Sequence, residues 1–271
     1  MIIDGHAHSA GVFLRKDTLV AELDRLGVDK IVLAPMGVAD ETGYESLNME
    51  DGFPDMADEA IEGHFHDLWE KFVDEFYEKP NQYLAWLKTQ CPERIIKYYW
   101  ANPKDPDIMQ RINDHYTEWN FSGIKLQQMV STFDTDQESM HQIAEFCESK
   151  DMPCFIHMFE KKHYYEFIEL LTDHQHTQFI VGHMFGFDTI SENALGLDNF
   201  WFDISPPWAM TVGKIEKALQ QYGPTRLMLG SDTPLGINNL EVNLKRVRSL
   251  SITEAEKELI LGENLRKMLK L

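Results

Sequence analysis

The stretch PCFIHMFEKKHYYEFIELLTDHQHTQFIVGHMF, residues 153–185, has the pattern of a strand, a helix and a second strand. Its two ends, 153–159 and 178–185, are short and almost continuously apolar, which is typical of strands buried on both faces of a parallel sheet. The middle, residues 163–174, repeats apolar side chains at helical spacing. A strand–helix–strand unit of this kind predicts a parallel sheet with covering helices.

The same alternation continues along the chain. Two more segments, 17–28 and 136–151, carry an apolar stripe at helical spacing. Further apolar runs that resemble strands lie at 1–4, 30–36, 95–103, 123–129, 200–205 and 226–232. With the two runs above, the chain has eight predicted strands in 271 residues, and a closed barrel of this type needs about 250 residues. We therefore predict an α/β fold, a single-domain (β/α)8 TIM barrel spanning residues 1–271.

One interval between predicted strands is longer than a loop and one helix require. It covers residues 37–94, is acidic and aromatic, and must contain helices of its own. It leaves the carboxyl end of the second predicted strand, the face on which barrel active sites form. We predict a helical insertion after strand 2 that acts as a lid or pocket wall, with an ordinary structural insertion as the alternative.

Composition excludes several classes of partner. The formal net charge of −20 repels nucleic acid, so we expect no nucleic-acid partner. No apolar run approaches the roughly 20 residues that span a bilayer, and polar residues interrupt the first eight positions, so we expect neither a membrane partner nor a signal peptide. Cys91, Cys147 and Cys154 are scattered and form no C-x-x-C pair, which favours a reducing, cytoplasmic location. Composition leaves a homo-oligomer open.

Three His-x-His triplets, at 6–8, 64–66 and 174–176, raise the possibility of a metal site. In a strand, residues two apart point to the same side, so His6 and His8 share one face at the carboxyl end of the first predicted strand. In a helix, residues two apart face away from each other, and the other two triplets lie in or beside predicted helices. We expect only His6 and His8 to form part of a metal site, and the other pairs to be surface residues.

Other polar residues arrive at the same end of the predicted barrel. His157, His183 and Asp232 each stand late in an otherwise apolar run, in the fifth, sixth and eighth predicted strands. Each alone is better explained as a hydrogen-bonded core histidine or as an aspartate that caps a loop. Together with His6 and His8, they form a set of imidazoles and one carboxylate that suits zinc or a similar divalent ion.

These residues carry a resemblance to a known family. A His-x-His pair on strand 1, histidines on strands 5 and 6 and an aspartate on strand 8 are similar to the amidohydrolase superfamily. Further stretches resemble its amidohydrolase-2 (aminocarboxymuconate-semialdehyde-decarboxylase-like) branch. They are IDGHAH (3–8), GIKL (123–126), GSDTP (230–234) and LGENLRKML (261–269).

The resemblance implies roles for five residues. His6, His8, His157 and Asp232 would bind one divalent metal ion, with zinc expected and manganese, iron or cobalt as alternatives. His183 would hydrogen-bond the metal-bound water or polarise the substrate. Zinc lowers the pKa of its water to about 7, and Asp232 would also take the proton from that water as a general base.

Three residues are candidates for substrate contacts. In other branches of the superfamily, a lysine on strand 4 is carboxylated and bridges two metal ions. Lys125 holds such a position, but one ion is the expectation for this branch, in which the lysine can be structural or orient substrate. Family members often have a histidine two residues later, where this chain has Gln127. Arg15, after the metal pair, and Trp208, after strand 7, could contact substrate or be ordinary rim residues.

We predict an enzyme, a metal-dependent amidohydrolase-type hydrolase that cleaves a C–N or C–O bond in a small organic substrate. The alternative is a non-oxidative decarboxylase, a lyase that acts on a small carboxylic acid with the same metal site. A non-catalytic barrel used for binding is a third hypothesis, which the complete ligand set disfavours.

Overall fold

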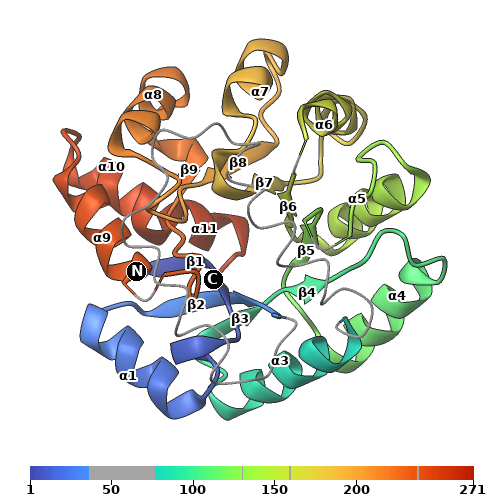
Figure 1. Ribbon diagram of the computed structural model, residues 1–271, viewed down its shortest axis with the longest axis horizontal. Coiled ribbons are helices and arrows are strands. Elements are labelled where there is room, and N and C mark those ends of the chain that lie inside the picture. The colour runs from blue at the N-terminus through green and yellow to red at the C-terminus, as the bar shows by residue number, and fades with distance from the viewer. Residues whose placement is uncertain (37–76, 130, 159, 237) are drawn as a thin grey trace.

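The computed structural model describes residues 1–36, 77–129, 131–158, 160–236 and 238–271, and Figure 1 shows it as a central group of strands with a ring of helices outside. Residues 37–76 of the predicted insertion, which include His64 and His66, lie outside the described residues. The described end of that insertion contains the helix α3 (Glu78–Gln90). The prediction of a lid therefore stays a prediction.

The strands run in chain order around the centre of the molecule. They are β1 (Ile3–His8), β2 (Lys30–Ala34), β3 (Ile95–Lys97), β4 (Tyr99–Trp100), β5 (Ile124–Gln127), β6 (Cys154–His157), β7 (Phe179–Val181), β8 (Phe200–Asp203) and β9 (Leu227–Met228). All neighbouring pairs are parallel, in the orders β1-β2-β3 and β4-β5-β6-β7-β8-β9.

The third predicted strand, 95–103, is wrong as one continuous strand. It is divided at Tyr98 into β3 and β4. Two bonds nevertheless continue the hydrogen bonding around this point, from the Tyr98 N–H to the Leu33 carbonyl at 2.9 Å and from the Ser122 N–H to the Lys97 carbonyl at 2.9 Å. The interruption therefore does not open the ring of strands.

Backbone hydrogen bonds join the segment after the last strand, β9, to the first strand, β1. The Gly5 N–H donates to the Leu229 carbonyl at 2.8 Å, and the His8 N–H donates to the Thr233 carbonyl at 2.9 Å. In the opposite direction, the Ser231 N–H donates to the His6 carbonyl at 2.9 Å. These bonds close β1 against the segment that follows β9, as the predicted (β/α)8 barrel requires.

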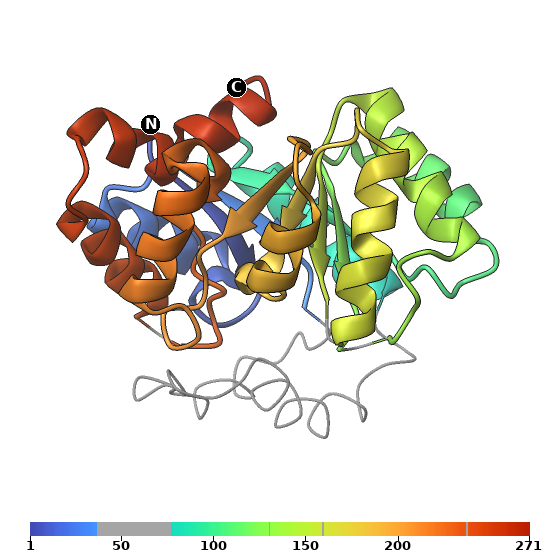
Figure 2. The same cartoon turned by 90° about the horizontal axis from the view of Figure 1, so that it is seen from above.

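Helices surround this ring, and both chain termini lie at the same end of it (Figure 2). They are α1 (Lys16–Leu26), α3 (Glu78–Gln90), α4 (Ile108–Trp119), α5 (Glu138–Lys150), α6 (Lys161–Asp173), α7 (Phe187–Asn193), α8 (Val212–Tyr222), α9 (Asn239–Ser249), α10 (Glu254–Glu258) and α11 (Asn264–Met268). The predicted helices at 17–28, 136–151 and 163–174 correspond to α1, α5 and α6. Gly27 ends α1 and caps it in the left-handed conformation, with φ 67°.

Two apolar cores result from strand alternation. The larger core lies between strands and helices and includes Leu23, Ile31 and Phe167. The smaller core contains side chains from β1, β2, β3, β6, β7 and β9, packed with Leu265 and Met268 of α11. The polar residues of β1 are not part of this smaller core, so one end of the barrel is available for a polar site.

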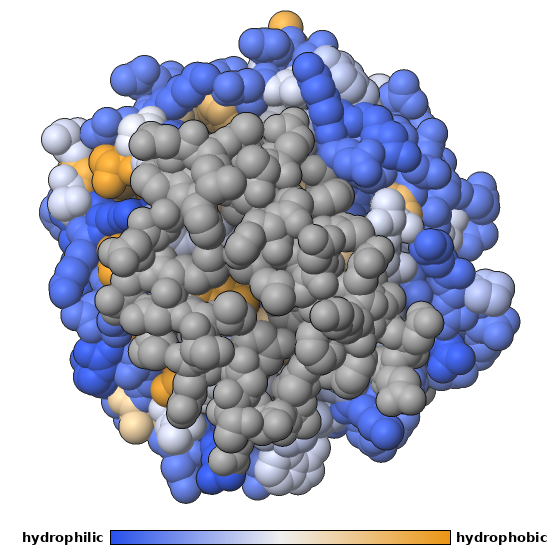
Figure 3. Space-filling view, viewed as in Figure 1, coloured by the Kyte–Doolittle hydropathy of each residue, from blue (hydrophilic) through white to orange (hydrophobic). Residues whose placement is uncertain are grey.

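On the face shown in Figure 3, the residues coloured by hydropathy are largely hydrophilic, in agreement with the high net charge. Large apolar side chains that are exposed within the described residues include Trp86, Tyr165 and Leu195. No helix of the described residues is long and apolar enough to cross a membrane.

Candidate metal centre

Two histidines of β1 and an aspartate that follows β9 meet at one end of the barrel. His6, His8 and Asp232 are all buried. The Nε2 atom of His8 lies 3.1 Å from Oδ1 of Asp232, and the Nε2 atom of His6 lies 3.6 Å from the same oxygen. The Asp232 N–H donates to the His6 carbonyl at 2.8 Å, so a backbone bond of the barrel closure brings this carboxylate to the histidines.

The other ring nitrogens of these histidines are already engaged. His8 Nδ1 lies 3.2 Å from the Pro35 carbonyl oxygen, which can only accept, so Nδ1 carries the proton. His6 Nδ1 lies 2.9 Å from Oδ2 of Asp203. With the proton on Nδ1, the neutral form of each ring presents the lone pair of Nε2 to the Asp232 carboxylate, and a cation between these acceptors would stabilise the arrangement.

The spacing fits such an ion. Ligand atoms that lie about 2.0–2.2 Å from a tetrahedral zinc ion are separated from one another by about 3.3 Å. The two distances from Asp232 Oδ1, 3.1 and 3.6 Å, bracket that value. Metal-ligating histidines also usually donate their second ring nitrogen to a carboxylate or a carbonyl, as these two do. The residues present therefore suit a divalent cation.

His157 and His183 lie beside this cluster. His157 ends β6, and His183 stands in the turn after β7 rather than in the strand. The Nε2 atom of His183 is 3.1 Å from Nδ1 of His157, whose other neighbour is Gln127 Nε2 at 2.8 Å. The ring centroids of His6 and His183 are 5.2 Å apart, so all these histidines share one site.

His157 is not in the three-residue sets whose ligand atoms lie within 4.8 Å of one another. Among the described residues, the sets at this end of the barrel are His6, His8 and Asp232, and His6, His183 and Asp203. The role of His157 as a fourth metal ligand therefore stays a prediction.

Backbone strain marks two of the predicted site residues. His183 has φ 59° and Asp232 has φ 55°, both in the left-handed region that non-glycine residues rarely occupy. Such conformations persist where the surrounding structure fixes them, and they cluster at functional sites.

Burial sets the charges of the histidines. It lowers the pKa of His183 to about 4, and it holds the pKa values of His6 and His157 well below the usual range. Neutral imidazoles are the form that binds metal ions. Burial alone would raise the pKa of Asp232, but His183, His8 and Lys125 outweigh it and lower that pKa, so the carboxylate is ionised.

Lys125 of β5 points into the barrel, as predicted. Its Nζ lies 3.1 Å from Nε2 of His6 and 3.9 Å from the centroid of the Phe155 ring. Burial lowers the pKa of Lys125 to about 7, although Asp232 and Asp203 oppose the shift. The amine is therefore placed beside the candidate metal ligands, whether it orients substrate or is carboxylated.

A profile described as "Amidohydrolase" matches residues 3–271 of this sequence. The chain belongs to the amidohydrolase family. The match covers nearly the whole chain, and it confirms the family that the histidine and aspartate motifs resembled. A search of curated protein sequences found no match.

Solved structures share the fold over its full length. A dihydroxybenzoic acid decarboxylase from Polaromonas, with bound manganese and the inhibitor 2-nitroresorcinol, has TM-score 0.71, 15% identity and coverage of 100% of this chain and 97% of that one. A TIM-barrel protein from Bordetella bronchiseptica has TM-score 0.72, 13% identity and coverage of 99% and 98%. A 4-oxalomesaconate hydratase from Rhodopseudomonas palustris has TM-score 0.69, 14% identity and coverage of 100% and 96%. These likenesses confirm the barrel fold.

Two buried carboxyl groups of the site were not predicted from the sequence. Asp203 ends β8 and accepts from His6 Nδ1, while Asp4 accepts from the Ser231 hydroxyl at 2.7 Å. Burial raises the pKa of Asp203 to about 8, against hydrogen bonds from Ser205 and His183. The available signal was the one used for His157, a polar residue that ends an apolar run, here FWFDIS (200–205).

The two rim candidates are placed differently. Arg15 precedes α1, with an exposed side chain. Trp208 is buried, and its indole N–H donates to the Leu235 carbonyl at 2.8 Å, which ties the loop after β8 to the loop after β9. The contact favours the rim-packing alternative for Trp208, and substrate contact by either residue stays a prediction.

His174 and His176 do not form a metal site with each other. His176 is exposed, as expected, but the expectation of a surface position is wrong for His174. His174 is buried directly after α6, where its carbonyl accepts from Asn199 at 3.0 Å and its Nε2 lies 2.8 Å from His141 Nδ1.

A third His–carboxylate cluster lies outside the barrel interior, at the start of α6. It consists of Asp134, His163 and Glu166. Lys162 already donates to Asp134 at 2.8 Å, and His163 Nδ1 accepts from the Glu160 N–H at 3.4 Å, which leaves the proton on Nε2. Lys162 therefore compensates the charge of Asp134, and the His163 ring has a backbone donor, without a metal ion.

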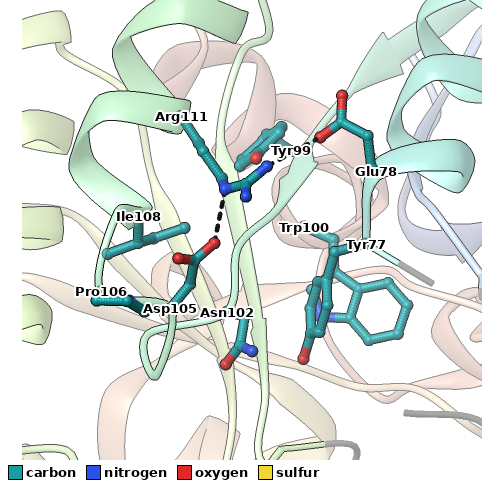
Figure 4. Close-up of a pocket in the computed structure, with 9 residues that line it drawn as sticks. All are labelled: Tyr77, Glu78, Tyr99, Trp100, Asn102, Asp105, Pro106, Ile108 and Arg111. Carbon is teal, nitrogen blue, oxygen red and sulfur yellow. Dashed lines mark ion pairs between the residues drawn. The ribbon is translucent and has the colours of Figure 1, made fainter. Parts of the chain in front are cut away.

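A separate pocket of about 360 Å³ lies between α3, β4 and α4 (Figure 4). Tyr77 and Trp100 form an aromatic wall with ring centroids 4.9 Å apart. On the opposite side, the Arg111 guanidinium lies 2.7 Å from Asp105 and 3.8 Å from Glu78. The cation is therefore already compensated, and the pocket lacks the imidazole set of the barrel site.

Proposed function

We propose that this protein is a metal-dependent hydrolase that cleaves a C–N or C–O bond in a small organic substrate. The observation that carries the proposal is the convergence of three ligand atoms, Nε2 of His6, Nε2 of His8 and Oδ1 of Asp232. These residues would hold one divalent ion, with His157 as the proposed fourth ligand. Zinc suits imidazoles with one carboxylate, and manganese, iron and cobalt remain alternatives.

A divalent ion in this site would supply Lewis acidity and lower the pKa of a water from about 16 to about 7. The residues of the chain would do the rest. The ionised Asp232 has one oxygen directed at the histidines, and its carboxylate can take a proton as a general base. Burial of the cluster keeps bulk water from competing for these contacts.

His183 would hydrogen-bond a water molecule at the site or polarise the substrate, the two roles that the family resemblance allows. Its Nδ1 lies 2.8 Å from the Ser205 carbonyl oxygen, and its Nε2 lies 3.1 Å from Nδ1 of His157. A water molecule or a substrate would therefore compete with His157 for Nε2.

Decarboxylation of a small carboxylic acid is the second candidate function. The observation in its favour is that the Polaromonas decarboxylase, which holds manganese, shares the fold over the whole chain. The same metal ligands would serve, and the buried amine of Lys125 beside His6 would offer a positive charge to a carboxylate.

Metal analysis tests the common basis of both candidates. We expect purified wild-type protein to contain one divalent ion per chain, and the His6→Ala/His8→Ala variant to contain none. His176→Ala, which removes an exposed histidine, is the matched control and should keep the ion. Equal metal content in all three proteins would show that the assigned site is wrong.

A substrate panel separates the reactions. Wild-type protein would be incubated with lactones, amides and aromatic acids, with acid production and released CO₂ measured in parallel. We expect acid from a lactone or an amide without CO₂. Release of CO₂ alone would replace hydrolysis by decarboxylation, and a metal-loaded protein without turnover would favour the non-catalytic barrel.

A further inference from the structure

The end of β8 contacts two histidines of the site at once. Oδ2 of Asp203 lies 2.9 Å from Nδ1 of His6 and 3.4 Å from the backbone nitrogen of His183. The carbonyl of Ser205, two residues later, lies 2.8 Å from Nδ1 of His183. A short segment, residues 203–205, therefore touches the ring of a candidate metal ligand and the ring of a candidate catalytic histidine.

The hydrogen-bond donors around Asp203 fix its role as an acceptor. The Ser205 hydroxyl donates to Oδ2 at 2.5 Å, and the Ser205 N–H donates to Oδ1 at 3.1 Å. Because the Ser205 hydroxyl proton is committed to Asp203, its oxygen can only accept from His6 Nδ1, 3.1 Å away. The Ser205 oxygen and the ionised form of Asp203 are thus both acceptors beside His6 Nδ1, which favours a proton on that nitrogen.

The opposite side of the His6 ring agrees with this assignment. The Nζ of Lys125, a donor, lies 3.1 Å from His6 Nε2, which must then offer its lone pair. For His183, Nδ1 faces the Ser205 carbonyl at 2.8 Å, but Nε2 lies 3.1 Å from Nδ1 of His157, which accepts from Gln127. These contacts therefore assign a tautomer to His6 and not to His183.

Packing holds the segment in place. Asp203 and Ser205 are 1% and 0% exposed, so water does not compete for their hydrogen bonds. Gly230 makes room for the carboxylate, because a Cβ at that position would lie 2.1 Å from Asp203 Oδ1 and 3.1 Å from the Cβ of His6.

We propose that Asp203 and Ser205 are positioning residues that fix the Nδ1–H tautomer of His6. His6 Nε2 is thereby kept unprotonated, as binding of a divalent cation in place of the Lys125 contact requires. The part that concerns the cation rests on the proposed function, whereas the tautomer belongs to the metal-free protein.

Nitrogen NMR of the histidine rings in metal-free wild-type protein is the direct test, with signals assigned by single histidine substitutions. We expect Nδ1–H and an unprotonated Nε2 for His6. Detection of the Nε2–H tautomer in His6 would overturn the proposal. Because this readout needs neither metal nor substrate, it separates failure of the proposal from failure of the proposed enzymatic function.

Asp203→Asn tests the causal role of the carboxylate. The carboxamide can turn its NH₂ group to His6, which would move the ring proton to Nε2 and block the cation. We expect zinc and cobalt affinity, measured by titration against a competing chelator, to fall 10–100-fold. The matched control is Asp188→Asn, which makes the same change at an exposed residue paired with Lys217 and should keep wild-type affinity.

Ser205→Ala extends the test to a milder change. It removes the hydroxyl that donates to Asp203 but keeps the carboxylate that faces His6 Nδ1, so we expect the His6 tautomer to be unchanged and the loss of metal affinity to be smaller than for Asp203→Asn. A folded Asp203→Asn protein with the wild-type His6 tautomer and wild-type affinity would overturn the proposal. If that variant does not fold, the wild-type His6 tautomer decides.

Discussion

Asp4 is a carboxyl group buried on the same strand as the two histidines of the candidate metal site. It accepts from the Ser231 hydroxyl at 2.7 Å and from the His6 N–H at 3.3 Å, and it is 0% exposed. Burial raises its pKa to about 7, although the bond from Ser231 opposes the shift. The folded protein therefore holds a proton on Asp4 over a pH range in which the unfolded chain has lost it.

This shift gives a signed prediction for pH. Because the folded-state pKa lies above the unfolded value of 3.8, the stabilisation is complete below that value and is lost as pH rises towards 7. Relative to Asp4→Asn, metal-free wild-type protein should lose about 2 kcal/mol of unfolding free energy between pH 5 and pH 7. Urea unfolding at pH 5, 6, 7 and 8 measures the difference, which should level off above pH 7. Parallel pH curves for the two proteins would contradict the prediction.

At the scale of the elements, the contact between β1 and the segment after β9 depends on a glycine. The Gly5 N–H donates to the Leu229 carbonyl, and a Cβ at Gly5 would lie 2.7 Å from that oxygen. The clash is with backbone, so the strand itself would have to shift. This contact is one of those that close the barrel beside His6.

Gly5→Ala should therefore destabilise the protein strongly. We expect a loss of about 2–4 kcal/mol, because the substitution adds volume to a packed contact and weakens a backbone hydrogen bond. The matched control is Gly213→Ala in α8, where a Cβ meets no atom nearer than 3.9 Å and helix propensity favours alanine by up to about 1 kcal/mol. Denaturant unfolding measures both. Equal stability of the two variants would show that the β1 contact does not limit closure.

Helices were predicted more accurately from the sequence than the ends of strands. The helix predicted over 136–151 is α5, and its apolar stripe, formed by Met140, Ile143, Ala144 and Cys147, is buried. Strand ends are less regular. β7 stops at Val181, and His183 lies in the following turn rather than in the predicted strand, because His183 and Met184 take the left-handed backbone conformation, with φ 59° and 52°.

For the whole molecule, an ion held between β1 and the segment after β9 would link the first and last strands of the ring. Binding to the folded state alone adds about 2.7 kcal/mol of stability when the free ion is at 100 times its dissociation constant. We expect removal of the ion by a chelator to lower Tm by about 5–10 °C in differential scanning calorimetry. The His6→Ala/His8→Ala variant should show no shift on chelation. An equal shift in both proteins would mean that stabilisation comes from another place.

The sequence by itself determined the family and the parallel barrel, because the alternation of apolar runs and amphipathic segments and the motifs around His6, His8 and Asp232 are local patterns. It also distinguished the pair on β1 from the other triplets, since the two-residue period of a strand places His6 and His8 on one face.

Only the tertiary structure decided which groups meet at those histidines. His6 and its partner Asp203 are 197 positions apart, and His8 and Asp232 are 224 apart. Such contacts depend on which strand ends become neighbours when the ring closes and on how each side chain is buried there. No local pattern encodes these relations, so the orientation and tautomer of each imidazole are set by the closed barrel.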